Sequence, residues 1–308
     1  MNRLAGIIVA VIGLLIAVLS IAGILPGFIS TGIVMILLGA LVIGLSFIRK
    51  PDPQGVERMS TPNTLLNIFI SPTETFQNLR RHPRWLAAVL IMTAMSAIFF
   101  SSFLYRLTPE RVTNFSIDKA LELPIMNEQA RKQTEATRPQ AIADAKNPLL
   151  RIGQAVNGFT GRVYLSAFMA IIFFIFALAM GGKMNYWQAF SAAVYAGFPF
   201  AVVAFVISMV VLFLKDPADV HPVMGLQGGL IQDNLNFLVT PSKSPVIYTL
   251  LSFFGLLTFY WLWLNATGIK NGGENVTSST AWTATLSIFA ALVLLGLIAA
   301  FAFPGFIS

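Results

Sequence analysis

The chain has no cysteine, only two histidines and few charged residues. The lack of cysteine excludes disulfides and thiolate metal sites. The two histidines, His82 and His221, lie far apart in the sequence and match no zinc-binding spacing, so we expect no metal site and no cofactor. Only 11% of the residues are charged, whereas about a quarter is usual in soluble domains. The polar surface is too small for a water-facing globule, and lipid must solvate much of the chain.

Recognisable catalytic patterns are lacking as well. The sequence contains no phosphate-binding glycine loop followed by a basic residue and no dinucleotide fingerprint. A serine nucleophile needs a positioned base, and neither histidine is placed to act as one. We therefore expect no catalytic residues and no enzymatic activity. The formal net charge of +7 favours anionic lipid headgroups as partners in a chain this apolar, and nucleic acid is not expected.

Seven apolar runs are long enough to cross a bilayer core as helices, which takes about 20 residues each. None contains Asp, Glu, Lys, Arg or His. The predicted fold class is therefore an all-α polytopic integral membrane protein with about seven transmembrane helices. The predicted spans are Ala5–Leu25, Ser30–Phe47, Trp85–Tyr105, Val163–Gly181, Ala189–Leu214, Val246–Thr267 and Ala281–Phe303.

The distribution of basic residues predicts the orientation. A raw count is undecided, because nine of the twenty Lys and Arg lie on the side of the amino terminus and nine more lie between Arg106 and Arg162. The positive-inside rule weighs charges close to span ends in short loops. Arg49 and Lys50 abut the second span, and three arginines precede the third. We therefore expect a cytoplasmic amino terminus and an external carboxyl terminus.

Three parts follow from this pattern. Residues 1–50 form a transmembrane hairpin, residues 51–84 a cytoplasmic linker with an interfacial amphipathic helix, and residues 85–308 a five-span domain. Within that domain the polar segment 107–161 is expected to be an extramembrane helical insertion, because Thr108-Pro109-Glu110 resembles a helix start. A solvated helix face or a partner-binding surface both explain this insertion.

The segment "NIFISPTETFQNLRRHPRW" (67–85) fits neither neighbouring span. Ser71-Pro72-Thr73-Glu74 has the form of a capping box, and the helix must end near His82-Pro83. An interfacial helix of this kind places its apolar face in the acyl boundary and its arginines among the headgroups. The predicted interfacial anchors are Phe76, Leu79 and Trp85. The candidate headgroup ligands are Arg80, Arg81 and Arg84, for which ordinary positive-inside anchoring is the alternative.

The same segment resembles the "SP.ETF..L...P.W" entry to the first span of bacterial Yip1-domain proteins. "YWQAFSAAVYAGFPFAVVAFVISMVV" (186–211) is similar to the Tyr-x-x-x-Pro span of that family, here Tyr195 and Pro199. "NLNFLVTPSKSPVIYTLLSFFGLLTFYWLWLNATGIK" (234–270) is similar to the loop and span that follow, with its small-residue end at Gly268. The resemblance covers about residues 64 to 303, and the hairpin lies outside it.

The resemblance implies a multipass protein of the bacterial cytoplasmic (inner) membrane. Eukaryotic members of the family act in vesicle trafficking and bind partner proteins, but their "DLYGP" signature is missing here, so a trafficking role is not carried over. In the family an acidic residue is often expected where Gly255 stands, and its absence argues against a polar role at that position.

The spans themselves offer few polar groups. Ion-coupled carriers usually keep a titratable residue within the membrane, which argues against coupled transport. A neutral pore or lipid-moving cavity stays open, because Pro199 interrupts the helix hydrogen bonds and Tyr195 and Asn265 are polar enough to line a path. The simpler alternative is a tolerated kink whose polar neighbours bond to adjacent helices.

A small-x-x-x-small pair, Ala40 and Gly44, lies on the second span and is our candidate face for helix packing or a partner. The resulting hypothesis is a non-enzymatic Yip1-like membrane protein that organises membrane or binds a membrane-protein partner or a second copy of itself, as a subunit of a larger assembly. The alternative is a transporter or lipid-handling protein with an uncharged path near Pro199.

Overall fold

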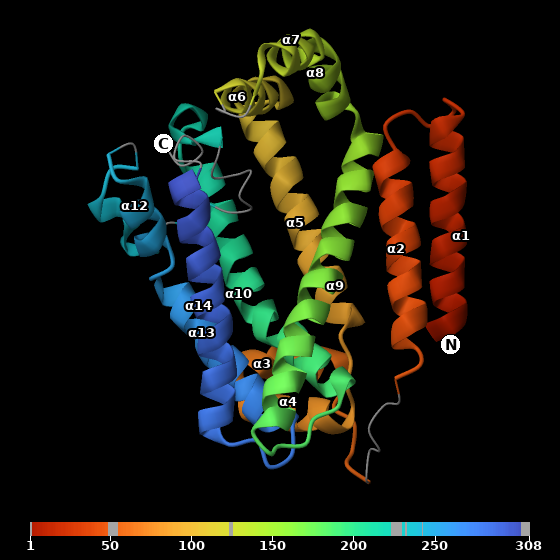
Figure 1. Ribbon diagram of the computed structural model, residues 1–308, viewed down its shortest axis with the longest axis vertical. Coiled ribbons are helices and arrows are strands. Elements are labelled where there is room, and N and C mark those ends of the chain that lie inside the picture. Colours follow the sequence, from red (N-terminus) through yellow and green to blue (C-terminus); the bar gives the residue numbers. More distant parts are fainter. Residues whose placement is uncertain are drawn as a thin grey trace. The chain divides into compact units, whose positions relative to one another are not determined.

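The computed structural model describes residues 2–48, 55–122, 126–222, 230–231, 233–241 and 243–302, and most of them are helical (Figure 1). Within these residues the only β-type pairings are two isolated bridges, Lys183 with Glu274 and Asn234 with Gly255. The α-helices are α1 Asn2–Ile21, α2 Ile29–Leu45, α3 Thr61–Ile70, α4 Pro72–Arg81, α5 Leu86–Leu107, α6 Pro109–Leu121, α7 Glu128–Ala136, α8 Arg138–Lys146, α9 Pro148–Ala179, α10 Tyr186–Leu214, α12 Pro245–Ser252, α13 Leu256–Gly272 and α14 Ser278–Ala302. Two short 3-10 helices, η1 Pro217–Asp219 and η2 Leu235–Leu238, complete the set.

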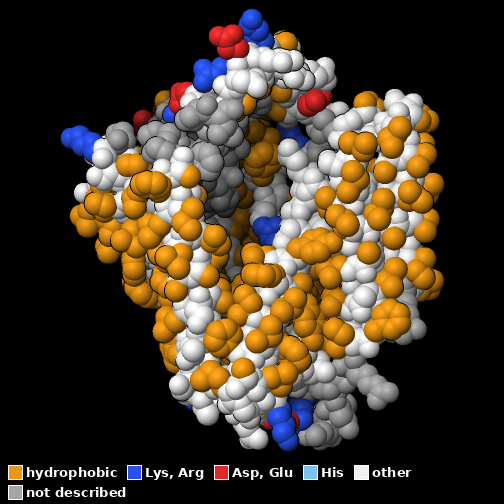
Figure 2. All heavy atoms as spheres, viewed as in Figure 1, with side chains coloured by type: hydrophobic (Ala, Val, Ile, Leu, Met, Phe, Trp, Pro, Cys, Tyr) orange, Lys and Arg blue, Asp and Glu red, His pale blue; other side chains and the backbone are white. Residues whose placement is uncertain are grey.

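The predicted fold class is confirmed. Among the described residues, α5, α9, α10 and α14 each contain an apolar stretch long enough to cross a membrane. Helices α1 and α2 are apolar but shorter. Figure 2 shows hydrophobic side chains along the visible face of the α1–α2 hairpin, as a surface solvated by lipid requires.

The chain forms two compact units, which we describe separately. Unit 1 comprises Met1–Ala94, Asn147–Phe198 and Thr267–Thr280. Unit 2 comprises Met95–Lys146, Pro199–Ala266 and Ala281–Ser308. Helices α5, α10, α13 and α14 each contribute residues to both.

In unit 1 the hairpin packs through glycines. A Cβ added at Gly13 would lie 2.7 Å from the carbonyl oxygen of Gly32, and one added at Gly39 would lie 2.6 Å from the backbone nitrogen of Ala10. No side chain fits where two backbones approach this closely. Glycine at these positions therefore sets the spacing of α1 and α2.

Helix α4 begins and ends close to the predicted residues, but not by the predicted capping. The side chain of Ser60 accepts from the backbone nitrogen of Asn63 and caps α3. Ser71 makes no side-chain cap to α4, so the predicted capping box is wrong. The reason is that Ser71 also ends α3, with its own nitrogen bonded to the carbonyl of Asn67, and its backbone is not in the extended conformation that a capping serine needs. Helix α4 ends at Arg81, before His82-Pro83, as predicted.

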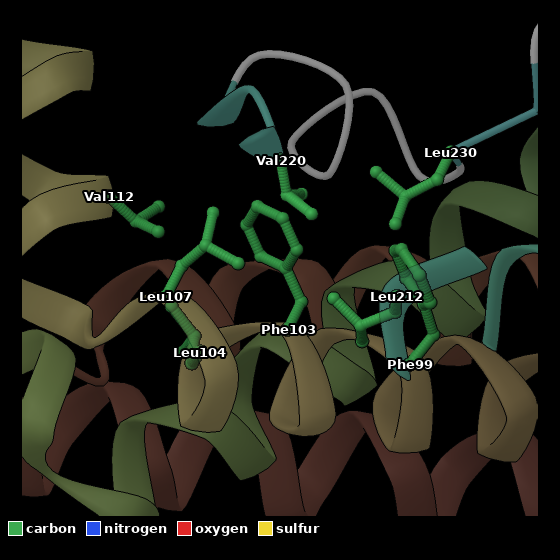
Figure 3. Close-up of a cluster of buried hydrophobic side chains, with 8 residues drawn as sticks. All are labelled: Phe99, Phe103, Leu104, Leu107, Val112, Leu212, Val220 and Leu230. Atoms are coloured by element: carbon green, nitrogen blue, oxygen red, sulfur yellow. The ribbon is translucent and has the colours of Figure 1, made fainter. Parts of the chain in front are cut away.

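The core of unit 2 is a cluster of apolar side chains (Figure 3). Helix α5 contributes Phe99, Phe103, Leu104 and Leu107, which pack with Val112, Leu212, Val220 and Leu230. Beside the cluster, the guanidinium of Arg111 donates to the carbonyl oxygens of Pro217 and Ala218 at 2.6 and 3.2 Å. The loop that follows α10 is thereby tied to α6.

The described residues of the polar segment 107–161 are mostly helical and form α6, α7 and α8, while its last residues belong to α9; its place outside the membrane stays a prediction. Arg138 joins the three short helices. Its guanidinium donates to Asn114 and Asp118 on α6 and to Glu135 on α7, at 3.1, 2.7 and 2.8 Å. These two carboxylates raise the pKa of the Arg138 guanidinium, with Glu135 contributing most.

Two predicted spans need correction. One uninterrupted span over Val246–Thr267 is wrong, because the chain leaves the helical conformation between α12 and α13, around Gly255. The run predicted at Val163–Gly181 contains no charged residue, but most of it is the second half of the longer helix α9. This helix begins at Pro148, and its membrane-length part includes Arg151 and Arg162. The hydropathy pattern locates the apolar run but not the start of its helix. Helix α9 runs through Gly158 and Gly161, so it begins well before the apolar run.

Candidate functional site: a basic cavity beside the α4–α5 loop

The three candidate headgroup arginines belong to the end of α4 and the loop that follows it, all in unit 1. Arg80 is a structural link rather than a free headgroup ligand. Its Nη1 donates to the carbonyl oxygen of Gly273 at 3.1 Å, and its own carbonyl accepts from Nε2 of Gln188 at 2.9 Å. Arg80 thus joins α4 to α10 and to the turn after α13.

Arg81 forms an ion pair with Glu274, with 3.0 Å between Nη1 and Oε1. The Arg81 side chain is only 17% exposed, whereas Glu274 is 42% exposed. Glu274 is held in place because its backbone exchanges two hydrogen bonds of 2.7 Å with Lys183. Most of the positive charge of Arg81 is therefore matched inside the protein.

Arg84 differs from both neighbours. Its Nη2 donates to Oδ1 of Asn78 at 3.3 Å, but Nε and Nη1 are buried and have no hydrogen-bond partner among the described residues. Burial lowers the pKa of the Arg84 guanidinium, Tyr195 opposes this effect, and Arg58 adds to it. Arg84 therefore keeps two unpartnered donors, whereas Arg80 keeps one, its Nε.

Arg84 lines a cavity of about 810 Å³ within unit 1. Its lining combines basic and aromatic side chains with apolar side chains of the hairpin. Its described lining residues include no aspartate or glutamate. The basic side is formed by Arg58, Arg81, His82 and Arg84, the aromatic part by Trp85, Phe159, Trp187 and Tyr195, and the hairpin wall by Val9, Leu38, Val42 and Leu45.

Tyr195 completes the polar side of the cavity. Its side chain is fully buried, and its hydroxyl has no partner within the described part of the chain. The sequence predicted Tyr195 as a polar intramembrane residue together with Pro199 and Asn265. Helix α10 continues through Pro199, and Asn265 donates from Nδ2 to the carbonyl of Trp261 in its own helix at 2.8 Å. Only Tyr195 of these three lines the cavity.

The predicted interfacial anchors differ in burial: Phe76 and Leu79 are buried, and Trp85 is half-buried. Phe76 and Leu79 are 0% and 2% exposed, so the prediction that they contact acyl chains is wrong. The ring of Phe76 lies against Gly268, where an added Cβ would be 3.1 Å away, and the apolar face of α4 therefore meets protein. Trp85 is half-buried and packs edge-on against Phe190, with 5.3 Å between the ring centroids.

Ala40 and Gly44 are both exposed on α2, and a Cβ added at Gly44 would meet nothing within 4 Å. A partner at this face stays a prediction. Among the described residues, no group of three or more His, Asp or Glu side chains is placed to hold a metal ion.

Several residues of the site were missed in the sequence. Asn78 holds the segment before α3 by donating from Nδ2 to the carbonyl of Glu57, while its Oδ1 accepts from Met59 and Arg84. Trp187 joins α10 to the end of α2 by donating from Nε1 to the carbonyl of Ile48 at 3.0 Å. Contacts between distant segments leave no local pattern in the sequence. The polar Asn78 next to the apolar Leu79 was the one feature that could have pointed to these contacts.

These helices, their exposed apolar faces and the basic interior cavity define a multi-pass integral membrane protein. Residues 66–300 match the sequence profile of the Yip1 domain, which is most of the chain. The protein therefore belongs to the Yip1-domain family, and the hairpin precedes the matched region. No curated protein and no solved structure matches the chain.

Proposed function

We propose that this chain is a non-enzymatic member of the Yip1-domain family that organises the membrane by binding a partner membrane protein, as a subunit of a larger assembly. The partner is a different membrane protein or a second copy of the chain. We place it in a bacterial cytoplasmic membrane, with the amino terminus in the cytoplasm, because the basic residues before the third span favour that side.

The outward face of α2 carries this proposal. Helices α1 and α2 pack against each other at glycines such as Gly13 and Gly39. At each of these positions the backbone of the other helix takes the space where a side chain would lie. Ala40 and Gly44 are additional small residues on a different, exposed face. Small residues one helical turn apart let a second transmembrane helix approach closely.

The extramembrane helices support the same function. Helices α7 and α8 bury none of their described residues. Arg138 of α8 nevertheless pairs with Asp118 of α6 and with Glu135 of α7. An ordered helical surface that contributes little to the core is suited to contact a partner outside the membrane.

A photo-reactive phenylalanine analogue at residue 40 tests the proposal in native membranes. We expect one discrete crosslinked protein from this position. The same analogue at Leu14, which is 55% exposed on α1, is the control and should yield none. Gly44→Leu should abolish the crosslink, because the larger side chain holds the second helix away. Crosslinks to lipid alone, or identical products from both positions, would contradict a partner at this face.

A further inference from the structure

The cavity beside Arg84 has the chemistry of a binding site for one particular class of ligand. Arg84 Nε, Arg84 Nη1 and the hydroxyl of Tyr195 are buried donors with no partner among the described residues. Leaving such donors unsatisfied is costly. The two guanidinium nitrogens can only donate, and the Tyr195 hydroxyl can donate as well, so a hydrogen-bond acceptor would satisfy all three.

The charge of the site selects an anion. Arg58 and Arg84 face the cavity with no acidic residue among its described lining, and Arg81, although paired with Glu274, adds to the same wall. A guanidinium binds phosphate oxygens through parallel hydrogen bonds, and basic pockets between membrane helices are suited to phospholipid headgroups.

The apolar part of the cavity lining favours a ligand that also has an apolar part. Val9, Leu38, Val42 and Leu45 present only apolar side chains to the cavity, and they belong to helices of the hairpin. A volume of about 810 Å³ lies within the range of roughly 300–1,000 Å³ that is usual for ligand sites. A water-soluble anion would leave this apolar wall unmatched.

We propose that the cavity binds one anionic phospholipid, with its phosphate at Arg84, Arg58 and Tyr195 and its acyl chain against the hairpin. The phosphate chemistry is shared with soluble phosphate esters, and the experiment separates the two sources. This site does not depend on the partner proposed above, and Arg84 variants should keep the crosslink at residue 40.

The experiment uses the full-length chain, freed of lipid, in a neutral detergent. It is titrated with dioleoyl phosphatidylglycerol, dioleoyl phosphatidylcholine or glycerol 3-phosphate. The measured quantity is the thermal midpoint of unfolding, because a ligand that binds the folded state raises it. We expect saturable stabilisation by phosphatidylglycerol, with at least about tenfold tighter binding than phosphatidylcholine, on the scale of a charged hydrogen bond. Equal affinity for the two lipids would overturn the anionic headgroup. Equal affinity for glycerol 3-phosphate would overturn the acyl chain and assign the site to soluble phosphates.

Arg84→Gln should weaken phosphatidylglycerol binding by about tenfold or more. Arg131→Gln, on α7 and outside the cavity, is the matched control and should leave it unchanged. Val42→Phe narrows the apolar wall and should weaken the lipid without removing charge. Unchanged binding in Arg84→Gln or in Val42→Phe would overturn the proposed pose.

Tyr195→Phe separates ligand binding from folding. Because the hydroxyl has no partner in the described chain, its removal should leave the lipid-free midpoint unchanged or raise it, while phosphatidylglycerol binding falls about three- to tenfold, as for one hydrogen bond. A lowered lipid-free midpoint with unchanged lipid affinity would show that the hydroxyl serves the fold and not the ligand.

Discussion

Arg80 and Arg81 are neighbours at the end of α4, and each binds a different residue of the turn after α13. Arg80 donates to the carbonyl of Gly273, and Arg81 pairs with the carboxylate of Glu274. Basic side chains are also favourable in the last turn of a helix, where the backbone carbonyls have no partners. At the residue scale, Arg80 and Arg81 stabilise the fold, and Arg84 is the arginine that we propose for a ligand.

Glu274→Gln tests the ion pair with Arg81. Glu274 is 42% exposed, so solvent screens the interaction. We expect a loss of about 0.5–1 kcal/mol in the free energy of unfolding, shrinking at high salt. The measurement is thermal unfolding in detergent at two salt concentrations. A loss that does not respond to salt would contradict an electrostatic origin.

Asp233 explains the glycine at position 255. Its carboxylate lies where a side chain of residue 255 would begin, with Oδ2 at 2.8 Å from an added Cβ. The same oxygen accepts from the backbone nitrogen of Leu257 at 2.7 Å, in the first turn of α13. An acidic group is therefore present near position 255, supplied from elsewhere in the chain.

Asp233→Ala should lower the free energy of unfolding by about 1 kcal/mol, as for loss of a helix cap. Asp233→Asn keeps an acceptor oxygen and should lose less. Asp219→Ala, at an exposed position, is the control. Equal thermal midpoints for Asp233→Ala and Asp219→Ala would show that the carboxylate does not support α13.

At the element scale, the existence of the helices was predictable and their surroundings were not. The apolar runs predicted the membrane helices, and Ser71-Pro72 and His82-Pro83 predicted the limits of α4. An amphipathic helix has the same pattern whether its apolar face meets lipid or protein, so the burial of Phe76 could not be foreseen. The break before α13 carries no proline, and the residue that binds the start of α13, Asp233, is distant in the sequence.

The site was predictable only in part, for the same reason. Arg84 and Tyr195 were each identified from the sequence, but for separate roles. Their common cavity depends on how α5, α10 and the hairpin pack within unit 1. Such packing is set by close approach of backbones, which sequence periodicity does not record.

The hairpin offers a direct test of element packing. Gly39→Val places a side chain against the backbone of α1 and should cost about 1–3 kcal/mol of stability, as overpacking does. Gly44→Val, at an exposed position of the same helix with open space around it, should change the thermal midpoint little. Equal midpoints for the two variants would contradict the glycine-mediated contact of α1 with α2.

At the scale of the whole molecule, the lack of cysteine makes topology measurable, because a single introduced cysteine reacts without background. Gln77→Cys on α4 and Gln133→Cys on α7 place thiols at exposed positions outside the apolar helices. With a cytoplasmic amino terminus, an impermeant maleimide added to intact cells should label residue 133, and residue 77 only after permeabilisation. The reverse pattern would invert the proposed orientation.

The central claim is that this Yip1-domain protein works by binding a membrane-protein partner. Native mass spectrometry of the chain, extracted gently from its own membrane, tests it most directly, with Gly44→Leu measured in parallel. We expect a stoichiometric second protein, or a second copy of the chain, in the wild type and its loss in Gly44→Leu. A lone chain carrying only lipid in both samples would contradict the account and leave the cavity at Arg84 as the functional centre of the molecule.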